Sequence, residues 1–351
     1  IFAHAENEFL SEYFEKSWNF GFLGTYGVEL FFVLSGFLIG QVLITSFARY
    51  GISFSTLRTF WKRRWWRTLP NYFLFLLIQL FISPHRAEFN WRYLFFLQNG
   101  ASGQPRFFQE SWSLAVEEWF YFTFPLIALL FYFAGKKYRR HLPQPTCQST
   151  PITAFKALMF TALLYIVGIN LLRFGLAHDM NLTWEEGIRK VMVLRIDSVM
   201  YGVVLALIKH HLTRLWLFLQ KYALPVGLAT LGLSLYFTLT LNLDTSIFAR
   251  SFLFTLISVG GALLLPYLDN VRESRKAVAT GSVLTHISLI SYSMYLINIP
   301  ATKFIDLFNR HSGLYEGIVW FTLTWIVVIC AATLNYRFFE KPMMDRRDAL
   351  R

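Results

Sequence analysis

Seven ionisable side chains lie within or at the ends of strongly apolar segments of this 351-residue chain. Placing a charged side chain at the centre of a bilayer costs roughly 2.5–3.5 kcal/mol of insertion free energy, so such residues are candidates for a functional role. A histidine could take a proton from a hydroxyl, a carboxylate could orient that histidine, and an arginine could stabilise an oxyanion. Together these residue types are compatible with group-transfer chemistry inside a membrane. The seven residues are His4, Glu29, Glu117, Glu118, Arg173, Arg195 and Asp197.

Glu117 and Tyr121 are four residues apart, which places both on one face of a helix. Glu118 lies beside them in the same aromatic segment, where Ser111 or Ser113 could cap the helix. A solvated surface does not explain two acids a full turn inside such a helix. We therefore interpret Glu117 and Glu118 as candidate site residues, with a purely structural role as the alternative, and note that Tyr121 shares the face of Glu117.

Several of the other ionisable residues also have purely structural interpretations. Glu29 could be an interfacial acid stabilised by the helix dipole, or it could orient a base. Arg195 and Asp197 could neutralise each other, pair with residues on other helices, or bind substrate. His4 alone could be a hydrogen-bonded residue at the membrane interface. Histidine is, however, the commonest general base near neutral pH.

A basic cluster with interleaved tryptophans spans Lys62–Arg67. Its side chains could snorkel toward anionic lipid headgroups. Alternatively, Arg64 and Arg67 are three residues apart on one helix face and, with Arg63, could hold a phosphorylated cofactor. The chain has no glycine-rich phosphate loop and no metal-ligand spacing, so no metal is expected.

The elements that must position these residues are apolar helices. The chain is 55% hydrophobic and 15% charged, and its apolar runs recur at about the 20 residues that a bilayer requires. Ile1 is not an initiator, so we expect the native protein to continue upstream through a truncated first span. The predicted fold is an all-α polytopic transmembrane helix bundle of about ten spans, forming one domain over residues 1–351. An amphipathic interfacial helix is predicted at 51–67, and full spans are predicted at 26–46, 68–84, 113–134, 152–173, 190–209, 222–241, 247–268, 284–307 and 315–337.

The net charge of +12 is distributed in short basic blocks between the apolar runs. This pattern is typical of the positive-inside bias and argues against nucleic-acid binding. It predicts that both termini are cytoplasmic and that the chain contacts membrane lipids. The basic cluster then lies on the cytoplasmic side, whereas His4, Glu29, Glu117 and Arg195 lie toward the outer side. Within the span predicted at 26–46, Ser35 and Gly36 are predicted to be small packing residues between helices.

In order along the chain, these motifs resemble the bacterial acyltransferase-3 family, integral-membrane O-acyltransferases of surface carbohydrates. His4 resembles the histidine at the end of that family's first span. Gly27–Phe37 is similar to its Gly-Val-Asp/Glu-Leu-Phe-Phe-Val-Leu-Ser-Gly-Phe signature, and Arg64–Pro70 to its Arg-x-x-Arg and Leu-Pro element. Trp112–Glu117 resembles its Trp-Ser-Leu-x-x-Glu block. Weaker landmarks are Arg195–Gly202, Ser291–Leu296 and Phe339–Pro342.

The chain departs from the family pattern at two places. The family's arginine upstream of the histidine is absent from these residues, and Asn298 stands where relatives often have a histidine. We therefore assign no proton transfer to that position.

The resemblance implies a bacterial inner-membrane enzyme that uses acyl-CoA, usually acetyl-CoA, as donor and a hydroxyl of an extracytoplasmic carbohydrate or glycolipid as acceptor. The arginines of the basic cluster would hold the phosphates of CoA, and the pantetheine arm would reach into the bundle. His4, aided by Glu29 or Glu117, would deprotonate the acceptor. The residues implied for substrate or oxyanion binding are Arg195, Asp197 and Tyr121.

Two other classes of protein remain open from the residues alone. A secondary transporter of a sugar or lipid would also carry intramembrane acids, but it predicts inverted repeats that are not detectable in the sequence. A structural or sensory membrane protein would have little need for buried acids.

Overall fold

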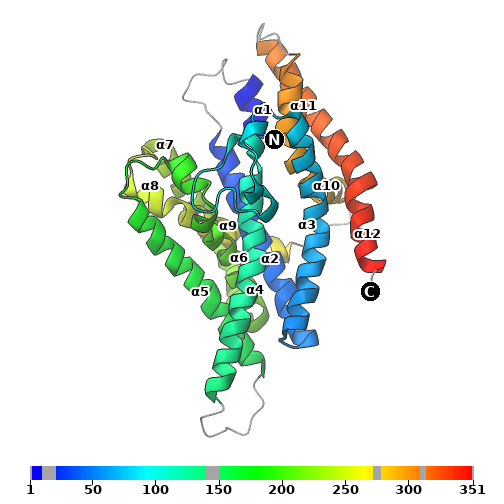
Figure 1. Ribbon diagram of the computed structural model, residues 1–351. Coiled ribbons are helices and arrows are strands. Elements are labelled where there is room, and N and C mark those ends of the chain that lie inside the picture. Colours follow the sequence, from blue (N-terminus) through cyan, green and yellow to red (C-terminus); the bar gives the residue numbers. More distant parts are fainter. Residues whose placement is uncertain (1, 10–20, 140–149, 272–277, 309–313, 350–351) are drawn as a thin grey trace.

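Long helices packed side by side make up the molecule (Figure 1). The structure is a computed structural model that describes residues 2–9, 21–139, 150–271, 278–308 and 314–349. Within these ranges no strand occurs, so the predicted all-α class is confirmed. The long helices are α2 (Phe22–Tyr50), α3 (Phe54–Ile82), α4 (Ser111–Arg139), α5 (Thr150–Leu176), α6 (Ile196–His211), α7 (Thr213–Thr240), α9 (Leu253–Asn270), α10 (Val278–Asp306) and α11 (Leu314–Asn335). Short helices are α1 (Phe2–Phe9), α8 (Ile247–Ser251) and α12 (Lys341–Ala349).

Seven helical stretches among the described residues are long and apolar enough to cross a bilayer. The chain is therefore a multi-pass membrane protein. Each of the nine predicted spans corresponds to a helix, but α6 has only 16 residues and α3 contains the basic cluster. The total of about ten spans stays a prediction.

The helix α3 is continuous, although the sequence predicted an interfacial helix at 51–67 and a separate span at 68–84. The helix begins after Ser53, whose side chain accepts a hydrogen bond from the backbone N–H of Thr56 at 3.2 Å. It then continues through Pro70 to Ile82. The basic cluster consequently belongs to the same rigid element as the apolar residues that follow it.

The span predicted at 190–209 begins as a regular helix only at Ile196. The backbone carbonyl of Asn99 accepts from the N–H of Met192 at 2.8 Å, and the Asn99 side-chain amide donates to the carbonyl of Lys190 at 2.7 Å. These contacts engage backbone groups that an α-helix would otherwise use. Two irregular turns precede the helix instead, η5 (Trp184–Arg189) and η6 (Met192–Leu194).

Glycines allow α2 and α6 to cross in close contact at the centre of the bundle. A Cβ atom added to Gly36 would collide with the backbone carbonyl of Val199, and one added to Gly202 would collide with that of Val33. Small residues permit such close approach between membrane helices. The predicted packing role of Gly36 is confirmed, and the contact fixes how these two helices present their polar residues.

Candidate functional site

One buried ion pair joins α2 to the start of α6. Arg195 donates from Nη2 to Oε1 of Glu29, and neither side chain is more than 1% exposed. The hydroxyl of Ser258 on α9 donates to the other carboxylate oxygen of Glu29 at 3.1 Å. The guanidinium of Arg195 also lies 3.6 Å from the ring centroid of Phe254. Both oxygens of Glu29 are therefore engaged in contacts that connect three helices.

A second buried ion pair joins α5 to α6. Arg173 donates to both carboxylate oxygens of Asp197, at 3.1 and 2.6 Å. Its guanidinium also donates to the side-chain oxygens of Asn170 and Thr255, each at 3.0 Å. Arg195 and Asp197 thus do not neutralise each other, because each pairs with a residue of another helix. Of the interpretations left open by the sequence, the structure supports pairing between helices.

A third polar cluster lies between α2, α3 and α4. Arg64 donates from Nη2 to the hydroxyl of Tyr121 at 2.8 Å. The hydroxyl of Ser35 lies 3.0 Å from the same oxygen. Trp61 donates from Nε1 to the backbone carbonyl of Tyr121 at 2.9 Å. Ser35, which was predicted to be a packing residue, therefore contributes a buried polar group to this cluster.

Glu117 and Glu118 are both buried beside the third cluster. Each carboxylate lies within electrostatic range of Arg64. Oε1 of Glu117 and Oε2 of Glu118 nevertheless have no hydrogen-bond partner among the described residues. A buried polar atom without a partner costs about 1–3 kcal/mol, and such atoms are rare in native folds. Two unfilled acceptors on one turn of α4 mark a place where a ligand or water would bind.

The arginines of the basic cluster differ in their surroundings. Arg64 is half-buried and faces α4, whereas Arg63 and Arg67 are exposed. Arg67 lies within electrostatic range of Glu117 and of Glu340. The predicted clamp therefore consists of one inward-facing and two exposed arginines.

His4 has a different set of neighbours. The helix α1 packs against α10, α11 and α2. The His4 side chain lies within electrostatic range of Arg189, Lys190 and Lys303. Across the described part of the chain, no hydrogen bond or ion pair joins His4 to either of the two acids that the sequence predicted would orient it. The three predicted catalytic residues thus have three distinct environments.

Sequence reasoning did not assign a buried polar network that connects α3, α10 and α11. Ser293 donates to Oε2 of Glu340 at 2.6 Å, and Asn71 donates to the same oxygen at 3.3 Å. Asn335 donates to the side-chain oxygens of Asn71 and Ser293, at 2.9 and 2.8 Å. Glu340 ends a π-helical turn, η8 (Tyr336–Glu340). The only signal in the sequence was the family resemblance around Ser293 and Glu340.

Glu110 is a second residue that the sequence did not single out. It lies just before α4, is buried, and has both carboxylate oxygens without a partner among the described residues. Burial raises the pKa of Glu110 to about 8, although the nearby positive charge of Lys303 opposes the shift. The hydroxyl of Tyr295 donates to the backbone carbonyl of Glu110 at 2.8 Å and lies 2.6 Å from the hydroxyl of Ser113. A buried carboxyl with a raised pKa therefore lies directly before the start of α4.

The chain matches the acyltransferase domain family (Acyl_transf_3) over residues 1–336 and belongs to that family. The fold and the match together define a multi-pass membrane protein with an acyltransferase domain, as the resemblance predicted.

Three relatives illustrate what the chain is similar to. The peptidoglycan O-acetyltransferase OatA of Listeria monocytogenes is 32% identical over 134 residues, which cover 33% of this chain and 21% of OatA. YrhL of Bacillus subtilis, provisionally named a peptidoglycan O-acetyltransferase, is 25% identical over 345 residues, covering 91% of this chain and 50% of YrhL. A Staphylococcus aureus protein from strain COL, provisionally named an O-acetyltransferase, is 26% identical over 360 residues, covering 93% of this chain and 53% of its own. The chain spans about half the length of the Bacillus and Staphylococcus relatives, and no solved structure matches it.

Proposed function

We propose that this protein transfers an acetyl group from cytoplasmic acetyl-CoA to a hydroxyl of a carbohydrate or glycolipid outside the cytoplasmic membrane. Membership of the acyltransferase domain family supports acyl transfer. The names of the relatives support acetyl as the transferred group and peptidoglycan as the first acceptor to test. The alternating basic loops support cytoplasmic termini and a cytoplasmic position for the basic cluster.

The two unfilled carboxylate oxygens on α4 carry this proposal. Glu117 and Glu118 lie beside Arg64 at membrane level, where a missing hydrogen bond cannot be supplied by lipid tails. By contrast, the carboxylate oxygens of Glu29 and Asp197 are all engaged by arginine or hydroxyl donors. The unfilled acceptors therefore favour α4 and its neighbour α3 as the place where substrate binds.

The donor site would use the exposed side of the basic cluster. Arg63 and Arg67 are exposed, so their guanidinium groups are free to approach the phosphates of CoA. Arg64 faces inward and would form the inner wall of the same site through its contact with Tyr121. Glu117 would complete that wall.

On the acceptor side, His4 is the proposed general base. It would take the proton of the acceptor hydroxyl as the hydroxyl oxygen forms a bond to the thioester carbonyl carbon. The carbon–sulfur bond then breaks, and CoA leaves as the thiol after receiving that proton. Because Arg195 is occupied by Glu29, we assign stabilisation of the oxyanion to the cations near His4, with Lys303 as the first candidate.

The test uses the full chain, purified in lipid nanodiscs. Acetyl-CoA should raise its unfolding temperature, and acetylated peptidoglycan fragments should be detected by mass spectrometry. We expect His4→Ala to lower transfer by about 10²–10⁴-fold, the usual contribution of a general base. The exposed residue His178 provides the matched control His178→Ala.

Glu117→Gln should lower transfer at least tenfold, because it alters a carboxylate in the donor-site wall, whereas Glu316→Gln at an exposed position should have no effect. Full transfer by both His4→Ala and Glu117→Gln would refute the assignment of these residues. No stabilisation by saturating acetyl-CoA would refute the donor and favour a transporter.

A further inference from the structure

A cavity of about 380 Å³ lies between α3, α4 and the segment that connects them. Its volume is within the roughly 300–1,000 Å³ range of small-molecule sites. The helix α3 contributes Trp65, Leu69 and Phe73, and the connecting segment contributes residues 94–97. Trp65 and Phe73 still expose more than a third of their surface, so the cavity is open toward the outside of the bundle. Nearly all of its wall is aromatic or aliphatic.

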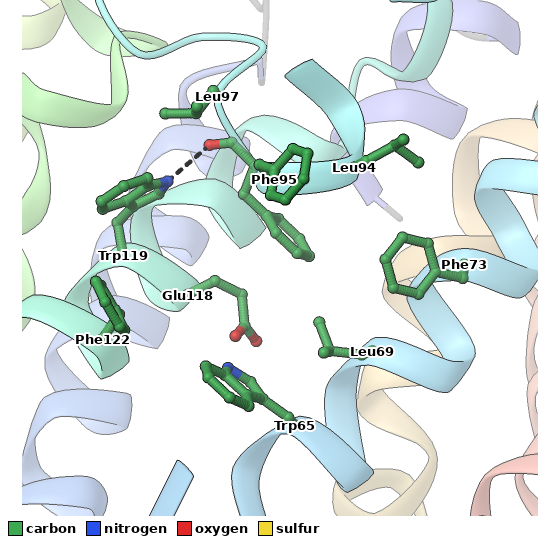
Figure 2. A pocket seen from close by; sticks show the side chains of 10 residues that line it. Trp65, Leu69, Phe73, Leu94, Phe95, Leu97, Glu118, Trp119 and Phe122 are labelled. Atoms are coloured by element: carbon green, nitrogen blue, oxygen red, sulfur yellow. Dashed lines mark hydrogen bonds between the residues drawn. The ribbon is translucent and has the colours of Figure 1, made fainter. Parts of the chain in front are cut away.

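Among the residues that the structure describes, Glu118 is the one charged residue that lines the cavity. Figure 2 shows its carboxyl group pointing into the space between Trp65 and Leu69. The side chain is 8% exposed, and Oε2 has no hydrogen-bond partner among the described residues. A purely apolar occupant would leave this acceptor unsatisfied. An occupant that combines an apolar body with a hydrogen-bond donor would match both the walls and this acceptor.

Phe96, which also lines the cavity, has a strained backbone. Its φ of 56° makes it the one non-glycine residue with positive φ in the described ranges. Trp119 donates from Nε1 to the Phe96 carbonyl at 3.1 Å, and the Phe96 ring lies 4.2 Å from that of Tyr72, measured between centroids. Such strain costs on the order of 1–3 kcal/mol and concentrates at ligand sites. These contacts therefore hold one wall of the cavity in an unfavourable but defined shape.

The cavity begins beside the basic cluster and extends along α3. Trp65 lies next to Arg64 in the sequence, and Arg64 is within electrostatic range of Glu118. Because a helix rises about 1.5 Å per residue, Trp65 and Phe73 are separated by about 12 Å along α3. A flexible chain whose charged end lies at the arginines could therefore extend through the cavity toward the connecting segment.

We propose that this cavity binds the pantetheine arm of the acyl-CoA donor, with Glu118 accepting a hydrogen bond from an amide N–H of the arm. This inference rests on the proposed function and specifies where the donor lies. Pantetheine alternates methylene groups with amides, which matches apolar walls around a single acceptor. Its phosphate end would lie at the arginines and its thioester end toward residues 94–97. A lipid tail would fit the walls but would leave Glu118 without a donor.

The first test compares two soluble probes on the full chain in nanodiscs by calorimetric titration. Acetyl-CoA carries the arm, whereas adenosine 3′,5′-bisphosphate carries phosphates and no arm. Leu69→Trp should fill the cavity and weaken acetyl-CoA binding at least tenfold, while binding of the bisphosphate stays unchanged. Leu77→Trp is the matched control, because Leu77 lies on the same helix with 53% exposure and does not line the cavity.

The second test separates hydrogen bonding from charge at Glu118. Glu118→Leu removes the acceptor and should weaken acetyl-CoA binding about tenfold, as expected for the loss of one hydrogen bond. Glu118→Gln keeps a carbonyl oxygen and should retain most of the affinity. Binding of the bisphosphate should be the same in both variants, which also shows that they remain folded.

Each contrary result has a distinct meaning. If the unchanged chain binds acetyl-CoA and Leu69→Trp binds it equally well, the arm lies elsewhere and this inference is refuted. If Leu69→Trp releases a co-purified phospholipid without affecting acetyl-CoA, the cavity is a lipid site. If the unchanged chain binds neither probe, the proposed donor itself is refuted, and this inference with it.

Discussion

The buried pair of Glu29 and Arg195 makes it possible to separate a structural role of Glu29 from the catalytic role that the sequence predicted. Glu29→Gln keeps the shape of the side chain but removes the negative charge opposite Arg195. The guanidinium, whose Nε and Nη1 already have no partners among the described residues, would then be buried without compensation. Removing one partner of a buried ion pair costs about 3–5 kcal/mol. That is a large part of the roughly 5–15 kcal/mol that stabilises a typical domain.

Removing both charges should be far less harmful. Replacing a buried ion pair with apolar residues of similar volume is often neutral or stabilising by about 1–4 kcal/mol. We therefore expect Glu29→Leu/Arg195→Met to recover most of the stability that either single replacement loses. Ser258 would lose its acceptor in this variant, so recovery should fall short of complete by about 1 kcal/mol.

The assay is reversible unfolding in mixed detergent and dodecyl sulfate micelles, with acetyl transfer measured on the same samples. A folded double variant that transfers acetyl at close to the original rate would establish Glu29 as structural. A folded double variant with transfer reduced more than a hundredfold would instead support the catalytic role. If Glu29→Gln proves as stable as the unchanged chain, the ion-pair reasoning is wrong.

Three further perturbations follow from the packing and the buried polar groups. Gly36→Leu should destabilise the bundle by about 1–3 kcal/mol or more in the same unfolding assay, because the new Cβ would meet a backbone carbonyl of α6. Gly27→Leu should not destabilise it, because a Cβ added at Gly27 has no atom within 4 Å. Tyr121→Phe removes the hydroxyl that accepts from Arg64 and should destabilise the chain by about 1.5–3 kcal/mol, and an unchanged unfolding curve would contradict that role. Burial raises the pKa of Glu110 from 4.5 to about 8, so its contribution to stability is complete below pH 4.5 and is lost as the pH rises through 8. At about 1.4 kcal/mol per pKa unit the loss is at most about 5 kcal/mol, and Glu110→Gln should flatten the decline in unfolding temperature between pH 5 and 9.

The positions of the helices were predictable because they depend mainly on residue type. Each long helix in the described ranges contains a predicted apolar run, although α3 was predicted as two elements. The smallest side chain, at Gly36, identified a close crossing. Predicted helix boundaries were less accurate where a residue distant in sequence hydrogen-bonds to the backbone at the helix end. The start of α6 depends on Asn99, which is far away in sequence. Its side-chain amide donates a hydrogen bond to the carbonyl of Lys190, and its backbone carbonyl accepts one from the N–H of Met192. No local pattern contains that information.

Partner choice could not be read from the sequence for a geometric reason. Arg195 and Asp197 are two residues apart, and side chains at that spacing do not share a helix face. They therefore point to different neighbours, Glu29 on α2 and Arg173 on α5. Which neighbour each meets depends on the rotation of α6 against the other helices. That rotation is set by contacts such as Gly202 against Val33.

Five of the buried acids fall into two groups that hydropathy cannot distinguish. Glu29 and Asp197, on α2 and α6, have both carboxylate oxygens engaged by protein donors. Glu110, Glu117 and Glu118, at or within the first turns of α4, each have at least one oxygen without a partner in the described structure. Unfilled acceptors are costly unless a ligand, a water or a proton satisfies them. The donor is therefore best sought between α3 and α4, while the paired acids hold α2, α5, α6 and α9 in the arrangement on which that site depends.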